Sequence, residues 1–147
     1  MTSALVVGAV LPERRFGPQT RTDIVRYQGA SGDFNSIHHD DEIARSAGMP
    51  GVFSVGMLQA GYLGTYCVEL FGAESVRRLS VRFAAQVWPG DELVCRGVIS
   101  ALAQDGHSAE LDLTIGDVNG SVAVSASVTV VLGCPTPDGP ARTDHRD

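Results

Sequence analysis

The chain has 147 residues, 44% of them hydrophobic and 19% charged, which predicts one globular domain with a single core. A formal net charge of -6 argues against a nucleic-acid partner and gives no reason to expect binding to an anionic membrane. Cys67, Cys95 and Cys134 are odd in number and far apart, so neither a disulfide framework nor a structural zinc site is expected. The apolar run from Ala4 to Leu11 lacks preceding basic residues and is a poor secretory signal, so we expect a cytoplasmic protein.

The first part of the chain predicts a short arm, a helix and an irregular loop. Residues 1–18 form the arm, with one edge strand expected around residues 5–11. The sequence Thr20-Arg21-Thr22-Asp23 resembles a capping box, and the helix of roughly ten residues that it begins should end at Gly29 or Gly32. Residues 31–40 have no periodicity and favour turns. A short helix capped by Asp40 or Asp41 and running through residue 47 should follow.

The stretch from Ser54 to Phe71 predicts one long helix. It is apolar nearly all the way round, so we expect it to be buried on every side, with Ser54 as its N-cap and Gly72 at its end. Each interior glycine costs roughly 1 kcal/mol relative to alanine, which suggests that another element packs very close to the helix backbone. The glycines are Gly56, Gly61 and Gly64.

After Gly72 the pattern changes to the two-residue period of strands. Strands are predicted over residues 79–87, 92–102, 108–115 and 122–130, with an Asn119-Gly120 hairpin before the last one. Sequential hairpins give an antiparallel sheet, and a sheet curled around one apolar helix is the hotdog arrangement of the α+β class. The pattern also fits other α+β sandwiches. Residues 133–147 are expected to be a disordered tail, and the small domain is expected to pair into a dimer.

Two features are candidates for chemistry. Asp33 and His38 lie five residues apart in the irregular segment, where a carboxylate and an imidazole can together position and deprotonate a water molecule. On residue types alone, an aspartate in a Gly-Asp-x-Asn stretch more often organises a turn through hydrogen bonds to the backbone. The unpaired N–H groups of Gly56 and Met57, at the start of the long helix, suit a developing thioester enolate.

These features occur together in one known family. The segment Ser31-Gly32-Asp33-Phe34-Asn35-Ser36-Ile37-His38-His39-Asp40, followed by Val55-Gly56-Met57-Leu58, resembles the hydratase motif of MaoC-like (R)-specific enoyl-CoA hydratases and 3-hydroxyacyl-thioester dehydratases. That family has a Gly-Asp-x-Asn-Pro-x-His core and then His-Gly-Met at the start of its hotdog helix. The similarity continues through residues 81–83 and 89–93 and covers roughly residues 8–132.

The resemblance implies a single hotdog domain over residues 1–132 that acts as a hydro-lyase on acyl-CoA or acyl-carrier thioesters. It would reversibly hydrate trans-2-enoyl thioesters to (R)-3-hydroxyacyl thioesters, without a metal or other cofactor. Asp33 and His38 would hold the catalytic water, the Gly56 amide would bind the thioester oxygen, and Asn35 and Gly32 would support the loop. It further implies a homodimer, or a heterodimer with another hotdog chain.

Two departures from the motif, and three alternatives, stay open. Ser36 stands where the family has proline, and Val55 where it has the histidine of His-Gly-Met. One alternative is the small subunit of a two-chain hotdog dehydratase with a steroid or acyl-carrier substrate. A thioesterase is less supported, because the acid expected in the middle of the helix is missing and Glu69 lies near its end. A metal cluster over residues 38–41 is disfavoured, since adjacent ligands point in different directions.

Overall fold

A computed structural model describes residues 5–133, so Cys134 and all but the first residue of the predicted tail lie outside the described residues. Five strands form one sheet in the order β1-β3-β4-β5-β2, and every neighbouring pair is antiparallel. The strands are β1 (Arg14–Phe16), β2 (Val76–Phe83), β3 (Leu93–Leu102), β4 (Ser108–Asp117) and β5 (Val122–Val131). Strand β2 therefore lies at one edge of the sheet.

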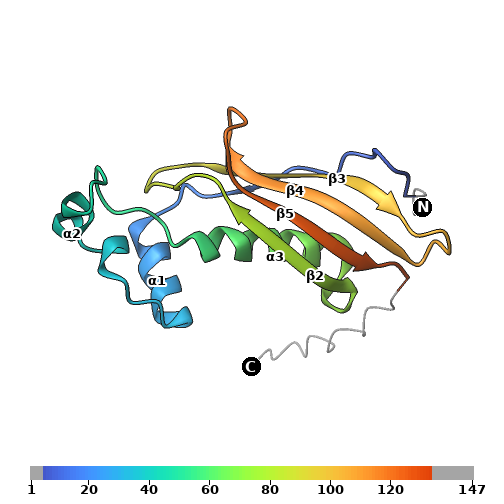
Figure 1. Ribbon diagram of the computed structural model, residues 1–147, viewed down its shortest axis with the longest axis horizontal. Coiled ribbons are helices and arrows are strands. Elements are labelled where there is room, and N and C mark those ends of the chain that lie inside the picture. Colours follow the sequence, from blue (N-terminus) through green and yellow to red (C-terminus); the bar gives the residue numbers. More distant parts are fainter. Residues whose placement is uncertain (1–4, 134–147) are drawn as a thin grey trace, which may run out of the picture.

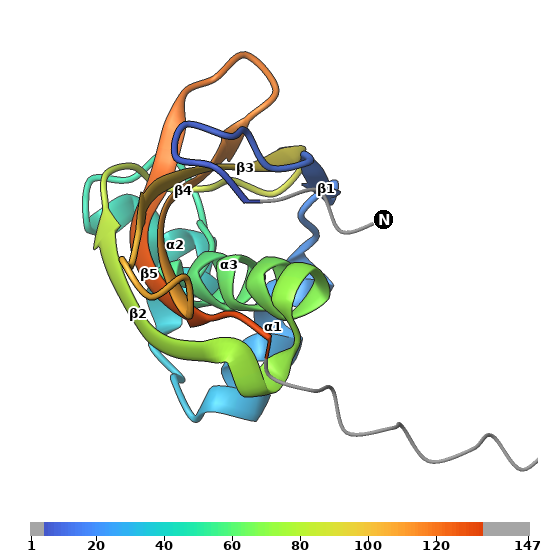
Figure 2. The ribbon, with the colours of Figure 1, turned by 90° about the vertical axis from the view of Figure 1, so that its right-hand side faces the viewer.

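The helices occupy two places around this sheet. They are α1 (Arg21–Ser31), the 3-10 turn η1 (Ser36–His38), α2 (Asp41–Ser46), α3 (Gly56–Phe71) and the 3-10 turn η2 (Ala73–Ser75). Figure 1 shows α3 running along the sheet, while α1 and α2 gather beyond one end of it. Figure 2 looks along α3 and shows the sheet curving around it. This is the α+β hotdog arrangement that the sequence predicted.

The core lies between the concave face of the sheet and α3. On β4 the alternation predicted from the sequence is confirmed, because Ala109, Leu111, Leu113 and Ile115 are all buried. Their partners are equally apolar side chains of β5 and α3: Val124, Val128, Val130, Leu63, Tyr66 and Cys67. Full burial of each large aliphatic side chain stabilises the fold by about 1.5–3 kcal/mol, so this contact holds the helix inside the sheet.

Helix α3 differs from the prediction at its start and in its burial. It begins at Gly56, and the N-cap is Val55, which makes no side-chain capping bond. One side of the helix remains uncovered, because a curved sheet in one chain reaches around only part of it. Along that side Met57 is 52% exposed and Val68 42%. The expectation that this helix is buried on every side is wrong for the single chain.

The interior glycines of α3 also differ from one another. A Cβ atom built at Gly56 would lie 3.0 Å from two carbons of the Phe83 ring, so β2 does pack closely there. At Gly64 the nearest atom, Leu79 Cδ2, would be 4.0 Å away, and at Gly61 nothing lies within 4 Å. Close packing against the helix backbone is thus confirmed only at Gly56.

The strand boundaries needed two corrections. No strand forms over residues 5–11, where the chain turns at Gly8 and Val10 makes an isolated bridge to Val98 of β3. The segment still lies beside β3, because the N–H groups of Gly8 and Leu11 donate to carbonyls of that strand. The N-terminal strand is β1 instead, three residues long. Strand β2 begins earlier than predicted and ends at Phe83, because the N–H groups of Ala84 and Ala85 both turn to the carbonyl of Ala123. Residues 84–87 therefore leave the sheet and cross above the start of α3.

The other local predictions are confirmed. Thr20 caps α1 in a capping box with Asp23, and Asp40 caps α2 through bonds from the N–H groups of Glu42 and Ile43. In the last hairpin, Asp117 Oδ1 accepts from the N–H groups of Asn119 and Ser121. Within residues 5–133, no helix is both long and apolar enough to cross a membrane.

Candidate active site

The loop that carries Asp33 and His38 begins where α1 ends. Gly32 closes α1 in the left-handed conformation, with φ of 75°, and donates its N–H to the carbonyl of Gln28. A Cβ at this position would meet no atom within 4 Å, so glycine is favoured by its backbone conformation and not by lack of space. Gly32 supports the loop in this sense, by turning the chain out of the helix toward Asp33.

Two successive side-chain turns shape the loop. Asp33 Oδ1 accepts from the N–H of Asn35 at 3.2 Å, and Asn35 Oδ1 accepts from the N–H of Ile37 at 3.2 Å, which caps η1. The turn-forming role that residue types alone suggested for Asp33 is therefore present. It occupies one carboxylate oxygen. Across the described residues, Oδ2 of Asp33 makes no hydrogen bond and the carboxylate forms no ion pair with His38.

The side chain of Gln28, on α1, binds the backbone of the loop through hydrogen bonds. It is 2% exposed. Its Nε2 donates to the carbonyls of Asp33 at 2.8 Å and Asn35 at 3.0 Å. Because both of its amide hydrogens are used, Oε1 must accept, and it does so from His39 Nδ1 at 2.9 Å. Gln28 was not among the residues predicted for the site, although its position four residues after the buried Ile24 places a polar residue on the inward face of the helix.

The His38 ring is oriented by the segment that leads into α3. Its Nδ1 lies 2.8 Å from the carbonyl oxygen of Phe53, and its ring meets the Phe53 ring edge-on with centroids 4.9 Å apart. A carbonyl can only accept, so Nδ1 carries the proton of the neutral ring and Nε2 keeps its lone pair. This is the arrangement that a general base or proton shuttle requires.

Asp41, the first residue of α2, links the start of α1 to the segment that leads into α3. Its two carboxylate oxygens both accept from Nη2 of Arg21, at the start of α1, and Oδ1 also accepts from the N–H of Val52 at 3.0 Å. The Val52 N–H, followed by the Arg21 guanidinium, lowers the pKa of Asp41 below its usual value. Asp40 caps α2 and His39 bonds to Gln28, so the side chains of residues 38–41 turn to different partners instead of converging on one point.

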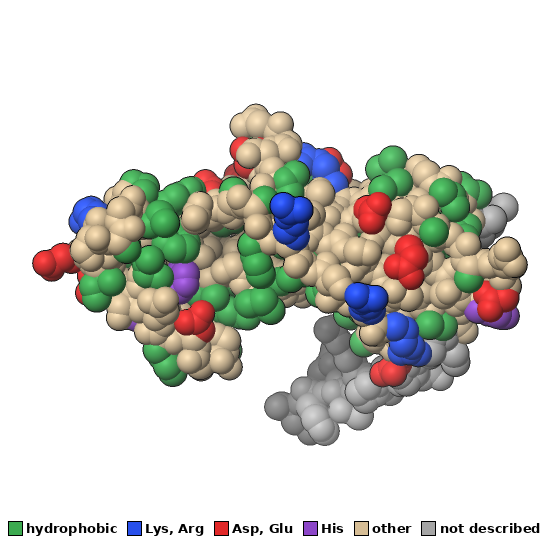
Figure 3. All heavy atoms as spheres, in the orientation of Figure 1, with side chains coloured by type: hydrophobic (Ala, Val, Ile, Leu, Met, Phe, Trp, Pro, Cys, Tyr) green, Lys and Arg blue, Asp and Glu red, His purple; other side chains and the backbone are tan. Residues whose placement is uncertain are grey.

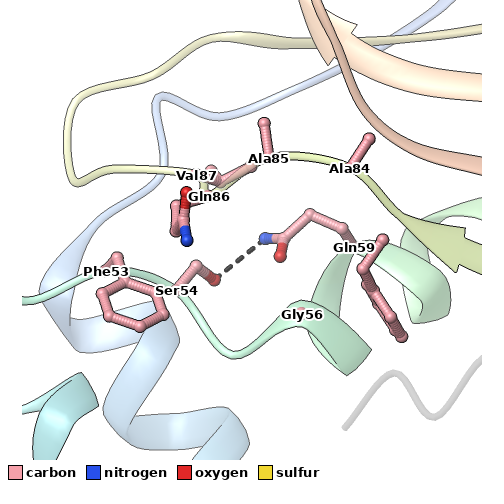
Figure 4. A pocket seen from close by; sticks show the side chains of 9 residues that line it. Phe53, Ser54, Gly56, Gln59, Ala84, Ala85, Gln86 and Val87 are labelled. Atoms are coloured by element: carbon pink, nitrogen blue, oxygen red, sulfur yellow. Dashed lines mark hydrogen bonds between the residues drawn. The ribbon is translucent and has the colours of Figure 1, made fainter.

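A pocket of about 240 Å³ opens at the start of α3 (Figure 4). It is lined by Phe53, Ser54, Gly56, Gln59, Phe83, Ala84, Ala85, Gln86 and Val87. The first-turn N–H groups of Gly56 and Met57 have no acceptor inside the helix, so this end of α3 favours a partial negative charge. Asp33 and His38 do not line the pocket. Phe53 joins the two regions, since its ring faces the pocket and its carbonyl holds His38.

The pocket also contains a buried amide that the sequence analysis did not identify. Gln59 Nε2 donates to Ser54 Oγ at 2.9 Å and to Gln19 Oε1 at 3.1 Å. Figure 4 shows the first of these bonds, with the amide oxygen of Gln59 turned away from Ser54. Ser54, which was predicted to cap α3, instead holds this amide. A glutamine within an otherwise apolar helix was the signal in the sequence.

Comparison with known proteins gives consistent results. A family model described as "MaoC like domain" matches residues 5–117. An (R)-specific enoyl-CoA hydratase from Aeromonas caviae is 29% identical over 121 residues, which cover 81% of this chain and 88% of that enzyme. A mitochondrial 3-hydroxyacyl-[acyl-carrier-protein] dehydratase from Arabidopsis thaliana is 33% identical over 99 residues. That match covers 67% of this chain but only 57% of the plant enzyme.

Solved structures share the fold. The (R)-hydratase from A. caviae involved in PHA biosynthesis superimposes with a TM-score of 0.77 at 26% identity, covering 89% of this chain and 99% of that one. A chain of the ChsH1-ChsH2 complex from Mycobacterium tuberculosis has a TM-score of 0.76 at 25% identity, covering 90% and 99%. With a family model matched from residue 5 to residue 117 and a hotdog fold shared with these proteins, the chain belongs to the MaoC-like dehydratase family.

Proposed function

We propose that this protein is a hydro-lyase that reversibly hydrates trans-2-enoyl thioesters to (R)-3-hydroxyacyl thioesters. The observation that carries the proposal is the His38 ring, whose Nδ1 is fixed on the Phe53 carbonyl so that the Nε2 lone pair is available to hold the attacking water. Phe53 also lines the pocket at the start of α3. The named activities of the A. caviae and Arabidopsis relatives support the same reaction class.

Each group has a role in the hydration direction. The thioester oxygen accepts from the N–H of Gly56, and the helix dipole of α3 stabilises the enolate that develops on it. Asp33 takes a proton from a water molecule held between its carboxylate and His38, and the water oxygen bonds to the β-carbon as the carbon–carbon π bond breaks. The dyad then delivers a proton to the α-carbon. The sum adds one water molecule with no change in redox state, so the reaction needs no cofactor.

The two departures from the family motif leave these groups in place. Ser36 is the first residue of η1, and the turn forms there on the Asn35 cap without a proline. Val55 is 4% exposed and precedes Gly56 as an N-cap without a side-chain bond. A hydrogen bond that a histidine would make at this position is absent, while the backbone N–H of Gly56 does not depend on it.

We further propose that the working form is a dimer. The uncovered side of α3 presents Met57 and Val68, and the neighbouring edge strand β2 presents Phe83, which is 49% exposed. Figure 3 shows hydrophobic side chains scattered over this view of the molecule, interspersed with charges of both signs. The preferred partner is a second copy of this chain. The likeness to a chain of the ChsH1-ChsH2 complex supports a different hotdog chain as the alternative partner.

Purified protein mixed with crotonyl-CoA tests the activity. We expect the enoyl-thioester absorbance to fall and chiral analysis to find the (R)-3-hydroxyacyl product. Release of free thiol in place of hydration would identify a thioesterase and contradict the proposal. Light scattering gives the oligomeric state of the same sample. A folded protein that is inactive alone but hydrates after mixing with a second hotdog chain would support the two-chain alternative.

A further inference from the structure

The pocket at the start of α3 is lined by apolar side chains together with a few uncharged polar ones. Its apolar side chains are those of Phe53, Phe83, Ala84, Ala85 and Val87. Ser54, Gln59 and Gln86 add one hydroxyl and two amides, and among residues 5–133 no acidic or basic side chain lines the space. A pocket built only for a hydrocarbon chain would have no need of buried amides, because an unpaired polar group in a dry site costs free energy. The lining therefore fits a neutral ligand with hydrogen-bonding capacity.

Gln59 is the most constrained of the three. It is 1% exposed, and both hydrogens of its amide nitrogen are already used, one on Ser54 Oγ and one on Gln19 Oε1. The amide oxygen accepts no hydrogen bond from the described part of the chain, and in Figure 4 it points away from Ser54, on the side of Gly56. What Gln59 offers to a ligand is thus a fixed acceptor, which pairs with a hydrogen-bond donor.

The position of Gln59 relates this acceptor to the proposed thioester site. Gln59 lies three residues after Gly56 on the same helix, a rise of about 4.5 Å along the axis at 1.5 Å per residue. Both residues line the same pocket. An acyl group whose thioester oxygen is bound at Gly56 therefore passes the Gln59 oxygen within its first several carbons.

Water can satisfy this oxygen while the pocket is empty, but a bound acyl chain displaces it. A purely hydrocarbon chain would leave the oxygen dry and unpaired, whereas a hydroxyl group would replace the lost hydrogen bond. We propose that Gln59 makes this enzyme selective for acyl thioesters that carry a hydroxyl group on the part of the acyl chain bound beside α3. The inference rests on the proposed hydratase function and adds a substrate class to it.

The wild-type enzyme provides the first test. A series of 2-enoyl-CoA substrates with a hydroxyl at successive carbons beyond the β-carbon is compared with analogues that have a methyl group in its place. At one position we expect kcat/KM to favour the hydroxyl by about tenfold or more. An oxo analogue, which accepts but does not donate, should gain nothing. A ratio near one at every position, or a preference for the oxo analogue, would overturn the proposal.

Variants at Gln59 provide the second test. Gln59→Met and Gln59→Leu remove the acceptor, and we expect the hydroxyl-over-methyl ratio to fall toward one in both. Gln104→Met, in an exposed turn remote from the pocket, should keep the wild-type ratio. Thermal melting shows whether each variant folds. If neither variant folds, the hydroxyl-over-methyl ratio of the wild-type enzyme alone tests the inference. A folded variant with an unchanged ratio would overturn the inference alone. If the wild type hydrates no enoyl thioester, either alone or mixed with a second hotdog chain, the proposed function itself is overturned.

Discussion

The Nδ1 atom of His38 and the carbonyl oxygen of Phe53 lie 2.8 Å apart, although fifteen positions separate the two residues in the chain. Phe53 belongs to the extended segment that enters α3, and His38 ends η1. This one contact ties the tautomer of His38 to the backbone beside the pocket at the start of α3. A shift of the entry segment would therefore change the orientation of the ring and the pocket wall together.

The first prediction concerns this tautomer. In the neutral His38 ring, the proton should reside on Nδ1, because the Phe53 carbonyl can only accept. Long-range nitrogen–proton NMR spectra distinguish the two neutral tautomers, and the His38 signals are assigned by their loss in His38→Ala. Signals of a neutral ring protonated on Nε2 would contradict the arrangement described here.

The second prediction concerns the proposed dyad. Asp33→Asn and His38→Ala should each lower kcat/KM for hydration by at least about 100-fold, the effect expected when an acid–base group is lost. Both side chains lie on a loop outside the main core, so circular dichroism and thermal melting should show a folded protein.

The exposed residues Asp112 and His107 supply matched controls. Asp112→Asn and His107→Ala make the same types of change away from the site and should leave kcat/KM near the wild-type value. Near-normal activity of either dyad variant would exclude that residue from catalysis.

The third prediction concerns Gly56. In Gly56→Ala the new methyl group would meet the Phe83 ring at 3.0 Å and crowd the proposed oxyanion donor, so kcat/KM should fall about tenfold. Adding Phe83→Ala should restore part of this loss. Gly29→Ala on α1 is the control, because its Cβ would meet nothing within 4 Å and helix propensity alone should leave it neutral or stabilising. Wild-type activity in Gly56→Ala would argue against substrate binding at this amide.

The fourth prediction concerns Gln28. Gln28→Leu leaves the carbonyls of Asp33 and Asn35 without their donor, so the free energy of unfolding should fall by about 1–3 kcal/mol. Hydration should slow as well, because the loop would lose the contact that positions it. Urea denaturation measures the first effect, with Gln104→Leu on the surface as control. A variant as stable and as active as the wild type would show that α1 does not brace the loop.

The fifth prediction concerns the buried thiols. Burial raises the pKa of Cys67 to about 11 and that of Cys95 to about 12, so both are protonated, unreactive thiols at pH 8. In a Cys134→Ser background, a chromogenic disulfide reagent at pH 8 should label the native protein very slowly and two thiols rapidly in urea. Rapid labelling before unfolding would show that this part of the core opens readily.

Local signals in the sequence predicted most of the fold. The capping box at Thr20, the Asp40 cap, the Asn119-Gly120 turn and the alternation along β4 each depend on neighbouring residues, and each is confirmed. The errors arose where side-chain partners are decided by the folded arrangement and not by the local pattern. Ser54 faces Gln59 in the pocket instead of capping α3. The N-terminal apolar run lies beside β3 and exchanges backbone hydrogen bonds with it, but it forms no continuous strand there. Neither contact leaves a periodic pattern in the chain.

The candidate site was predictable in part for the same reason. Asp33, Asn35 and His38 stand within one short segment, so their types and spacing were visible together. Gln28 acts on the backbone carbonyls of Asp33 and Asn35, and Phe53 acts on His38 through its own backbone carbonyl, which any residue would provide. Side-chain identity cannot reveal a backbone acceptor, so the tautomer of His38 could be inferred only from the folded chain.

The position of β2 at the edge of the sheet leaves its backbone open to pairing with strands of other chains. Its outer residues include Arg77, Arg78 and Arg82, and among residues 5–133 none of the three forms an ion pair within 4.0 Å. Repeated charges along an open strand discourage the stray strand addition that starts aggregates, since an incoming chain must bring acidic groups or crowd the arginines. The arginines of β2 thus reduce aggregation with unfolded chains, while the edge stays available for the proposed dimer.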